Sequence, residues 1–176
     1  KGSIKLHEFP LELPLFLNTL KDEFERQASK KGIHFDVTAL NTLPEFILAD
    51  EARLTQILSI LLENAIKFTD KDGGVVLAVS SSMNMDRSLL TFSVIDSGAG
   101  IPLEQQDNIF KLFTQADGSA TRSFGGTGIG LALATRLAET MGGRIEVKSI
   151  VGTGSNFQFS APFSVPENIP VKANRA

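Results

Sequence analysis

Apolar side chains recur at helical spacing in three long segments of the chain. The segments cover about residues 13–31, 50–69 and 127–141, and the first and third end at glycines. Spacing of three and four residues places such side chains on one face of a helix, and Asp50 is a suitable N-cap for the second segment. We therefore predict three amphipathic helices, and a shorter one over about residues 103–110.

Between these helices, apolar and polar residues alternate as they do in half-buried strands. The alternating runs include two that a polar loop around residues 84–87 joins and two that the turn "VGTG" joins, so both pairs are predicted to be antiparallel. The chain is thus predicted to be an α/β (α+β) two-layer sandwich, in which helices cover one face of a mixed, mostly antiparallel sheet of about five strands. The predicted strands are a short one that passes through Pro10, then 33–40, 44–50, 75–81, 88–96, 144–150 and 155–162.

Composition narrows the class of protein without identifying it. The chain has 176 residues, 42% hydrophobic and 21% charged, which suits a single domain with a sizeable core. A formal net charge of −3 gives no reason to expect nucleic acid or an anionic membrane as a partner. Cysteine is absent from the sequence, which excludes disulfides and thiolate metal sites. The expectation is a cytoplasmic domain that does not contact the membrane.

Asn64 is the polar exception on the apolar stripe of the second helix. It lies seven residues after Ile57 and four before Phe68, which places it toward the covered side. A buried Asn without partners would cost about 1–3 kcal/mol, so it should meet backbone, water or a polar ligand. Lys67 lies on the flank, where the alternative to a ligand contact is a solvated pair with Glu63.

Asp96 ends a predicted strand and begins the turn "DSGAGI". Gly98 and Gly100 would let the backbone of this turn approach another group closely. Two interpretations stay open at this point. The turn could be a simple loop closed by an Asx-turn, or the Asp96 carboxylate could accept a hydrogen bond from an amine-bearing ligand.

The stretch "RSFGGTGIGLALAT", residues 122–135, places glycines directly before a helix. It lacks the preceding strand of a Rossmann fingerprint, and the chain lacks the phosphate-binding pattern G-x-x-x-x-G-K-[ST]. The positive helix end and exposed amides at residues 127–130 nevertheless favour an anion.

In this order, the segments resemble the ATP-binding catalytic domain of sensor histidine kinases, and of the hybrid type in particular. "ILLENAIKFT" resembles the N box, "DSGAGI" the first glycine box, "IFKLFTQ" the F box and "GGTGIGL" the second glycine box. The resemblance covers about residues 5–163 and implies a Bergerat-type ATP-binding fold. It divides the chain into a linker (1–10), the catalytic domain (11–163) and a C-terminal linker (164–176).

The family also implies roles for individual residues. Asn64 would bind the Mg²⁺ that bridges the ATP phosphates, Lys67 would approach the phosphates, and Asp96 would accept the adenine amine. Phe110 and Phe113 would anchor a mobile ATP lid. The full set of implied ATP-binding residues is Asn64, Lys67, Asp96, Gly98, Gly100, Ile101, Phe113, Arg122, Gly126, Thr127, Gly128, Gly130 and Leu131.

The implied reaction is transfer of the γ-phosphoryl group to a histidine on a separate helical dimerisation domain, with a response-regulator receiver domain as a further partner and a homodimer as the full-length state. The domain would contribute positioning and charge neutralisation, with Asn64 and Lys67 as its catalytic residues. Neither His7 nor His34 has the sequence context of a phosphoacceptor, so both are expected to be structural.

Ile60 departs from the family pattern, because histidine kinases usually have Asn or His four residues before the N-box asparagine. Gyrase-type ATPases use Glu there to activate water, which Ile cannot do, so the departure argues against ATP hydrolysis. It also keeps open a second hypothesis, a degenerate domain with weak or no ATP turnover that regulates another kinase through protein contacts.

Overall fold

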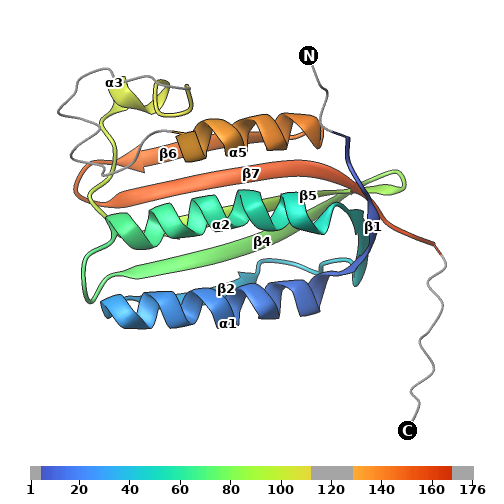
Figure 1. Ribbon diagram of the computed structural model, residues 1–176, viewed down its shortest axis with the longest axis horizontal. Helices are drawn as coiled ribbons and strands as arrows, with labels where there is room; N and C mark the ends of the chain where they lie inside the picture. Colours follow the sequence, from blue (N-terminus) through green and yellow to red (C-terminus); the bar gives the residue numbers. More distant parts are fainter. Residues whose placement is uncertain (1–4, 112–128, 168–176) are drawn as a thin grey trace, which may run out of the picture.

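A five-stranded sheet with helices packed on one face forms the body of the molecule (Figure 1). A computed structural model of the chain describes residues 5–111 and 129–167. The elements in chain order are β1 (Phe9–Glu12), α1 (Leu13–Lys31), β2 (His34–Ala39), β3 (Phe46–Ala49), α2 (Glu51–Phe68), β4 (Gly74–Asn84), β5 (Arg87–Asp96), α3 (Leu103–Gln106), α5 (Ile129–Thr140), β6 (Arg144–Ile150) and β7 (Gly154–Ser164).

The strand order in the main sheet is β2-β4-β5-β7-β6. The pair β2–β4 is parallel, and the other three pairs are antiparallel. β1 and β3 form a separate antiparallel pair at one end of the molecule. The prediction of a mixed, mostly antiparallel sheet of about five strands is therefore confirmed.

The long helices begin and end where their sequences allow it. Pro14 lies in the first turn of α1, where its missing N–H costs nothing, and Gly32 ends the helix in the left-handed conformation with φ 74°. At the start of α2, the Asp50 carboxylate accepts a hydrogen bond of 3.3 Å from the Arg53 amide. The same carboxylate accepts the His7 amide at 3.0 Å, which ties the entry segment to the helix.

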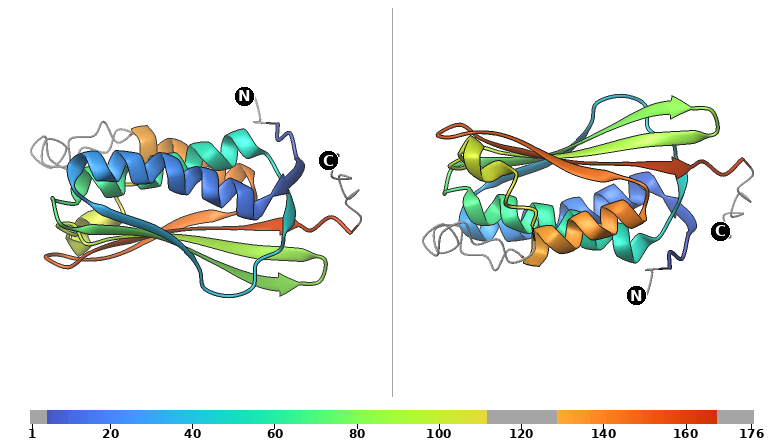
Figure 2. Two further views of the ribbon diagram at one scale, coloured as in Figure 1. Left: turned by 90° about the horizontal axis from the view of Figure 1, so that it is seen from below. Right: turned by 90° about the horizontal axis from the view of Figure 1, so that it is seen from above.

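The core lies between the sheet and the helices α1, α2 and α5, which all cover the same face (Figure 2). Phe92 of β5 and Phe159 of β7 are fully buried there, and their rings stack with centroids 5.8 Å apart. The opposite face is polar: the hydroxyl groups of Thr91 and Ser160, on the same two strands, lie 3.1 Å apart. This alternation of apolar and polar residues confirms the predicted two-layer sandwich with one covered face.

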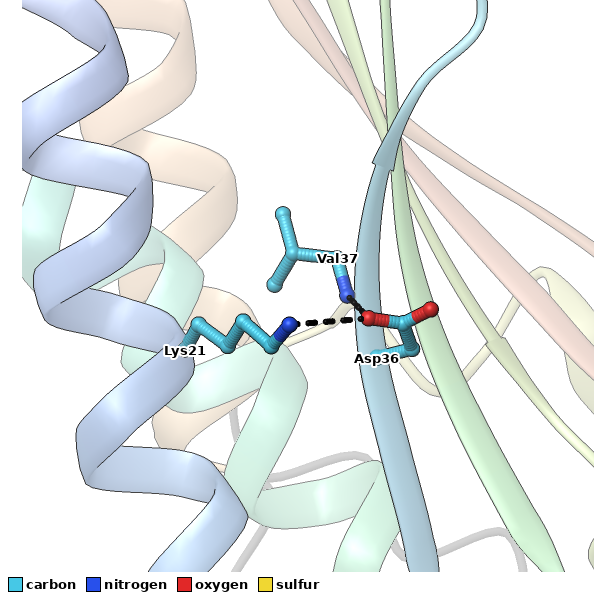
Figure 3. Close-up of polar contacts among 3 residues, drawn as sticks. All are labelled: Lys21, Asp36 and Val37. Atoms are coloured by element: carbon cyan, nitrogen blue, oxygen red, sulfur yellow. Dashed lines mark hydrogen bonds and ion pairs between the residues drawn. The ribbon is translucent and has the colours of Figure 1, made fainter.

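An ion pair at the surface joins the first helix to the edge strand of the sheet (Figure 3). Lys21 of α1 lies 3.3 Å from Asp36 of β2, and the same carboxylate oxygen accepts the Val37 amide at 2.9 Å. The Val37 amide, and secondarily Lys21, hold the pKa of the Asp36 carboxyl below its usual value. Because this pair is exposed to solvent, it positions α1 more than it stabilises the fold.

Two local predictions need correction, and one is confirmed. The helix predicted over about residues 103–110 ends at Gln106, because Asp107 continues into hydrogen-bonded turns that bring Phe110 onto the core. The polar loop predicted around residues 84–87 is present as a two-residue turn between β4 and β5, with Met85 at φ 58°. Phe68, predicted to lie in the apolar stripe of α2, is half-buried, while Leu62 and Ile66 are buried instead.

The short strand predicted to pass through Pro10 is confirmed. Phe9 and Pro10 pair with Ala49 and Leu48 in the two-stranded sheet. In the residues that the structure describes, every helix is too short or too polar to cross a bilayer.

Candidate nucleotide-binding site

Asp96 lies at the end of β5 and is 7% exposed. Its carboxylate oxygen accepts the Gly98 amide at 2.9 Å, which is the predicted Asx-turn. Burial raises the pKa of this carboxyl above its ordinary value, while hydrogen bonds from the backbone amides of Gly98 and Ser155 oppose the rise. A carboxylate offers about four lone-pair sites, so two amides leave capacity to accept a further donor.

Gly98 and Gly100 allow the turn after Asp96 to pack tightly against the rest of the molecule. A Cβ atom at Gly98 would lie 2.5 Å from the Phe68 carbonyl oxygen at the end of α2. Gly100 has φ 75°, and a Cβ there would overlap the carbonyl of Ile150 at the end of β6. Close packing within the fold therefore explains both glycines. That they also let the backbone approach a bound base stays a prediction.

The contact between Gly98 and Phe68 brings the end of α2 beside Asp96. Asn64 lies one helical turn before Phe68, about 6 Å along the axis, and is half-buried. Lys67 is exposed, and its ammonium group lies 5.9 Å from the centre of the Phe68 ring. The fold thus places the predicted phosphate-end and adenine-end residues on two adjacent elements.

The last turn of α2 is held by two side chains. The Thr69 hydroxyl donates to the Ala65 carbonyl at 2.7 Å. The Lys31 ammonium group, from the end of α1, donates to the carbonyl groups of Ile66 and Lys67 at 2.9 and 2.7 Å. These carbonyl groups lie in the last turn, where helices in general need partners from outside the helix, so the two side chains hold the turn that carries Lys67.

Ile60 lies one turn before Asn64 and contacts the helix that opens after the second glycine box. A Cβ atom at Gly130 would lie 3.4 Å from Cγ2 of Ile60. Ile60 and Leu131 are both half-buried and pack against the core. At this position, apolar packing between α2 and α5 takes the place of a polar side chain.

Whether Mg²⁺ can bind at this site depends on the oxygen atoms that its residues offer. Groups of three or more His, Asp or Glu side chains able to cage a metal are absent from residues 5–111 and 129–167. Mg²⁺ usually keeps several waters and binds one or two protein oxygens together with phosphate groups. The amide oxygen of Asn64 fits that mode of binding.

Comparisons with known proteins identify the family of this chain. Residues 49–165 match the family model of the histidine kinase-, DNA gyrase B- and HSP90-like ATPases. The chain belongs to this family. The chain is 39% identical over 172 residues to the aerobic respiration control sensor protein ArcB of Escherichia coli, covering 96% of the chain and 22% of ArcB. It is 44% identical over 140 residues to hybrid signal transduction histidine kinase A of Dictyostelium discoideum, covering 75% of the chain and 6% of that protein.

Solved structures show the same fold. Full-length ShkA, in complex with AMPPNP, matches with a TM-score of 0.80 and 36% identity, over 94% of this chain and 33% of that chain. The nucleotide-free catalytic domain of histidine kinase ThkA matches with a TM-score of 0.71 and 26% identity, over 89% of this chain and 96% of that chain. The ATPase domain is thus of the histidine-kinase type and has the Bergerat fold. The comparisons give the degenerate, regulatory alternative no support.

The described residues of the ATPase domain include part of the predicted site. Asn64, Lys67, Asp96, Gly98 and Gly100 converge at one end of the sandwich, where β5 and α2 end. Ile101 and Gly130 with Leu131 flank them on the neighbouring loop and on α5. Outside the described residues lie Phe113, Arg122, Gly126, Thr127 and Gly128. Of the lid that the resemblance implies between Ile101 and Gly126, residues 102–111 are described and residues 112–125 are not.

Sequence reasoning missed the residues that hold the site from outside the boxes. Lys31 reads locally as a cap for its own helix, yet it donates to carbonyl groups of α2. Ser149 and Gln106 bond the turn after Asp96 from β6 and α3. Lys31 and Ser149 lie 35 and 48 residues from Ile66 and Ile101, and all these partners are backbone atoms, so sequence pattern carries no signal for these contacts.

Proposed function

We propose that this chain binds ATP with Mg²⁺ and presents the γ-phosphoryl group to a histidine on a separate helical domain. Asp96 would accept the adenine amine, Asn64 would hold Mg²⁺, and Lys67 would neutralise phosphate charge. Bound Mg²⁺ supplies charge neutralisation between the phosphate groups, and the protein residues supply position. Asn64 and Lys67 are the proposed catalytic residues.

The observation that carries the proposal is the buried carboxylate of Asp96 beside the end of α2. A buried ionisable acceptor lowers the stability of the fold unless a hydrogen-bond donor pairs with it. The Asp96 carboxylate is therefore well suited to accept a hydrogen bond from the exocyclic amine of adenine. ShkA, which has the same fold, forms a complex with AMPPNP. The apolar contact of Ile60 with α5 gives this residue a packing role that is compatible with nucleotide binding.

Further parts of the proposal concern the protein around this domain. The chain spans 22% of ArcB and 6% of the Dictyostelium kinase. Its partners are therefore inferred from the class of protein to which these relatives belong. We infer a helical dimerisation domain that carries the acceptor histidine, a receiver domain as the next phosphoryl acceptor, and a homodimer in the cytoplasm. Residues 1–10 and 164–176 would connect the domain to these parts.

Calorimetric titration with AMPPNP and Mg²⁺ tests the binding step directly. We expect a saturable heat in the presence of Mg²⁺ and weaker binding when EDTA is added. An absence of heat up to about 1 mM ligand, a range that covers typical enzyme affinities, would contradict the proposal.

Phosphoryl transfer is tested separately, in the full-length parent protein, with radiolabelled ATP. We expect an acid-labile phosphohistidine that disappears in the Asn64→Ala variant. Label on the parent that persists in this variant would refute the role of Asn64.

A further inference from the structure

Ser149, the next-to-last residue of β6, makes three hydrogen-bond contacts through one hydroxyl group. Its oxygen lies 2.7 Å from the Ile101 amide nitrogen, 3.0 Å from the Gly154 carbonyl oxygen and 2.7 Å from the Ser155 hydroxyl oxygen. A hydroxyl group has one donor and two acceptor sites. If Ser149 donates to Gly154, it accepts from Ile101 and Ser155, and all its sites are used.

Gln106 of α3 holds the other side of the same residue. Its side-chain nitrogen donates to the Ile101 carbonyl at 2.9 Å and to the Ser149 carbonyl at 3.0 Å. Both backbone polar groups of Ile101 are therefore bonded, one to each side chain, where α3 contacts β6 (Figure 1). We name Ser149 and Gln106, with these bonds, the Ile101 clamp.

The clamp is also connected to Asp96. Ser155, whose hydroxyl contacts Ser149, is the partner of Asp96 in the pairing of β5 with β7. The Ser155 amide hydrogen-bonds the Asp96 carboxylate, and both residues are 7% exposed. Hydrogen-bond networks with every member satisfied are rigid, so one half-buried hydroxyl group links Asp96 with Ile101, and both residues are expected to bind ATP.

We propose that Ser149 is a positioning residue for the adenine end of the nucleotide site. It holds Ile101 and Ser155 in fixed positions relative to each other, and thereby fixes where Ile101 and the Asp96 carboxylate lie. Gln106 supports it from the side of α3. This proposal rests on the proposed function, and it adds that selectivity for the base depends on a hydroxyl group that does not touch it.

The test compares AMPPNP with inorganic triphosphate, which lacks the base. We expect Ser149→Ala to weaken AMPPNP binding about fivefold to tenfold, because it removes the hydroxyl group that holds Ile101 and Ser155, and triphosphate binding less than about twofold. Ser149→Thr keeps the hydroxyl group and should restore AMPPNP binding. Equal weakening of both ligands, or no weakening of either, would overturn the proposal.

Ser160→Ala is the matched control. Ser160 lies on β7 in a similar cross-strand hydroxyl pair with Thr91, away from Asp96. It should leave the ratio of the two affinities unchanged. Gln106→Glu serves as a second variant that removes both donors and places a carboxylate against two carbonyl groups. Gln106→Glu should weaken AMPPNP binding relative to triphosphate binding, as Ser149→Ala does. It therefore tests the proposal even if Ser149→Ala folds poorly.

Amide hydrogen exchange separates this proposal from the proposed function. The Ile101 amide should be protected in the ligand-free wild type and exchange faster in Ser149→Ala. If the wild type binds no AMPPNP, the proposed function fails. Rapid exchange of the Ile101 amide in the wild type would overturn the clamp, whether or not nucleotide binds.

Discussion

At the scale of single residues, Asp96 combines burial with an ionisable carboxyl group. Two backbone amides donate hydrogen bonds to its carboxylate. The remaining lone pairs of the carboxylate can accept a hydrogen bond from a ligand. Burial of this carboxyl group lowers the stability of the fold and provides a hydrogen-bond acceptor for a ligand, as buried functional groups often do. Two measurements on the Asp96→Asn variant separate these effects.

The first measurement is nucleotide binding. We expect Asp96→Asn to weaken AMPPNP about 10- to 100-fold, the range for losing a hydrogen bond to a charged group, because its amide nitrogen would oppose the adenine amine. Inorganic triphosphate should bind equally well to both proteins. Parallel losses for the two ligands in calorimetry would refute the adenine role.

The second measurement is stability against pH. Burial raises the pKa of Asp96 above 3.8 in the folded state. Between 3.8 and the raised value, the folded state binds more protons than the unfolded state, so this group lowers the free energy of unfolding as pH rises. Relative to Asp96→Asn, the wild type should therefore lose stability as pH rises from 3.8 through the raised pKa of Asp96, measured in urea titrations at a series of pH values. A wild type that gains on the variant over this range would show the opposite sign of shift.

At the scale of elements, the site depends on how α2 meets its two neighbouring helices. α1 contributes Lys31 to the last turn of α2, and α5 begins against Ile60. The helix that carries Asn64 is thus held at its end by hydrogen bonds and in its middle by apolar packing. Each contact can be removed separately.

Lys31→Met keeps the apolar stem and removes the donors to two α2 carbonyl groups. Because the side chain is exposed, we expect a loss of about 0.5–1 kcal/mol in the free energy of unfolding, together with weaker AMPPNP binding. Lys30→Met, its exposed neighbour in the same turn, is the control and should change neither quantity. Identical behaviour of the two variants would show that the carbonyl contacts contribute nothing.

Ile60→Asn restores the polar residue that the family usually has. We expect a loss of about 1 kcal/mol in stability, since apolar contact with the start of α5 is removed, and stronger Mg²⁺-dependent binding of AMPPNP. Thermal unfolding and calorimetry measure the two effects separately. An unchanged affinity would mean that Ile60 acts through packing alone.

At the scale of the whole molecule, the site lies where the ends of distant segments meet. The turn after β5 rests against the end of α2 on one side and against the end of β6 on the other. Gly100 carries the second contact, with positive φ and with space for a hydrogen atom alone beside the Ile150 carbonyl. Tight packing here joins the nucleotide site to the sheet.

Gly100→Ala should therefore be strongly destabilising. It combines backbone strain of about 1–2 kcal/mol with overlap of the new methyl group and a backbone carbonyl. Gly152→Ala is the matched control, because Gly152 has φ 82° and open space around its Cβ position, so it incurs the backbone strain alone. Urea denaturation should show a larger loss for Gly100→Ala, and equal losses would exclude the close contact.

Local sequence was sufficient to determine the helices, the strands and their layering, because 3.6- and 2-residue periodicities report directly which faces are buried. It failed where short-range signals conflict with packing. The turns after Gln106 and the burial of Ile66 in place of Phe68 depend on what covers each side chain. Sequence also placed Asp96 and Asn64 in motifs, and the fold brings these two segments together.

What the sequence could not indicate is how the site is held. Lys31, Ser149 and Gln106 bond to groups 35, 48 and 5 residues away, and the partners are backbone atoms, which every residue possesses. A sequence motif specifies side chains, so it gives no information about the backbone carbonyl and amide groups with which they form hydrogen bonds. Sequence motifs were sufficient to predict which residues bind the nucleotide, whereas the packing of α1, α2, β6 and α3 determines where those residues lie.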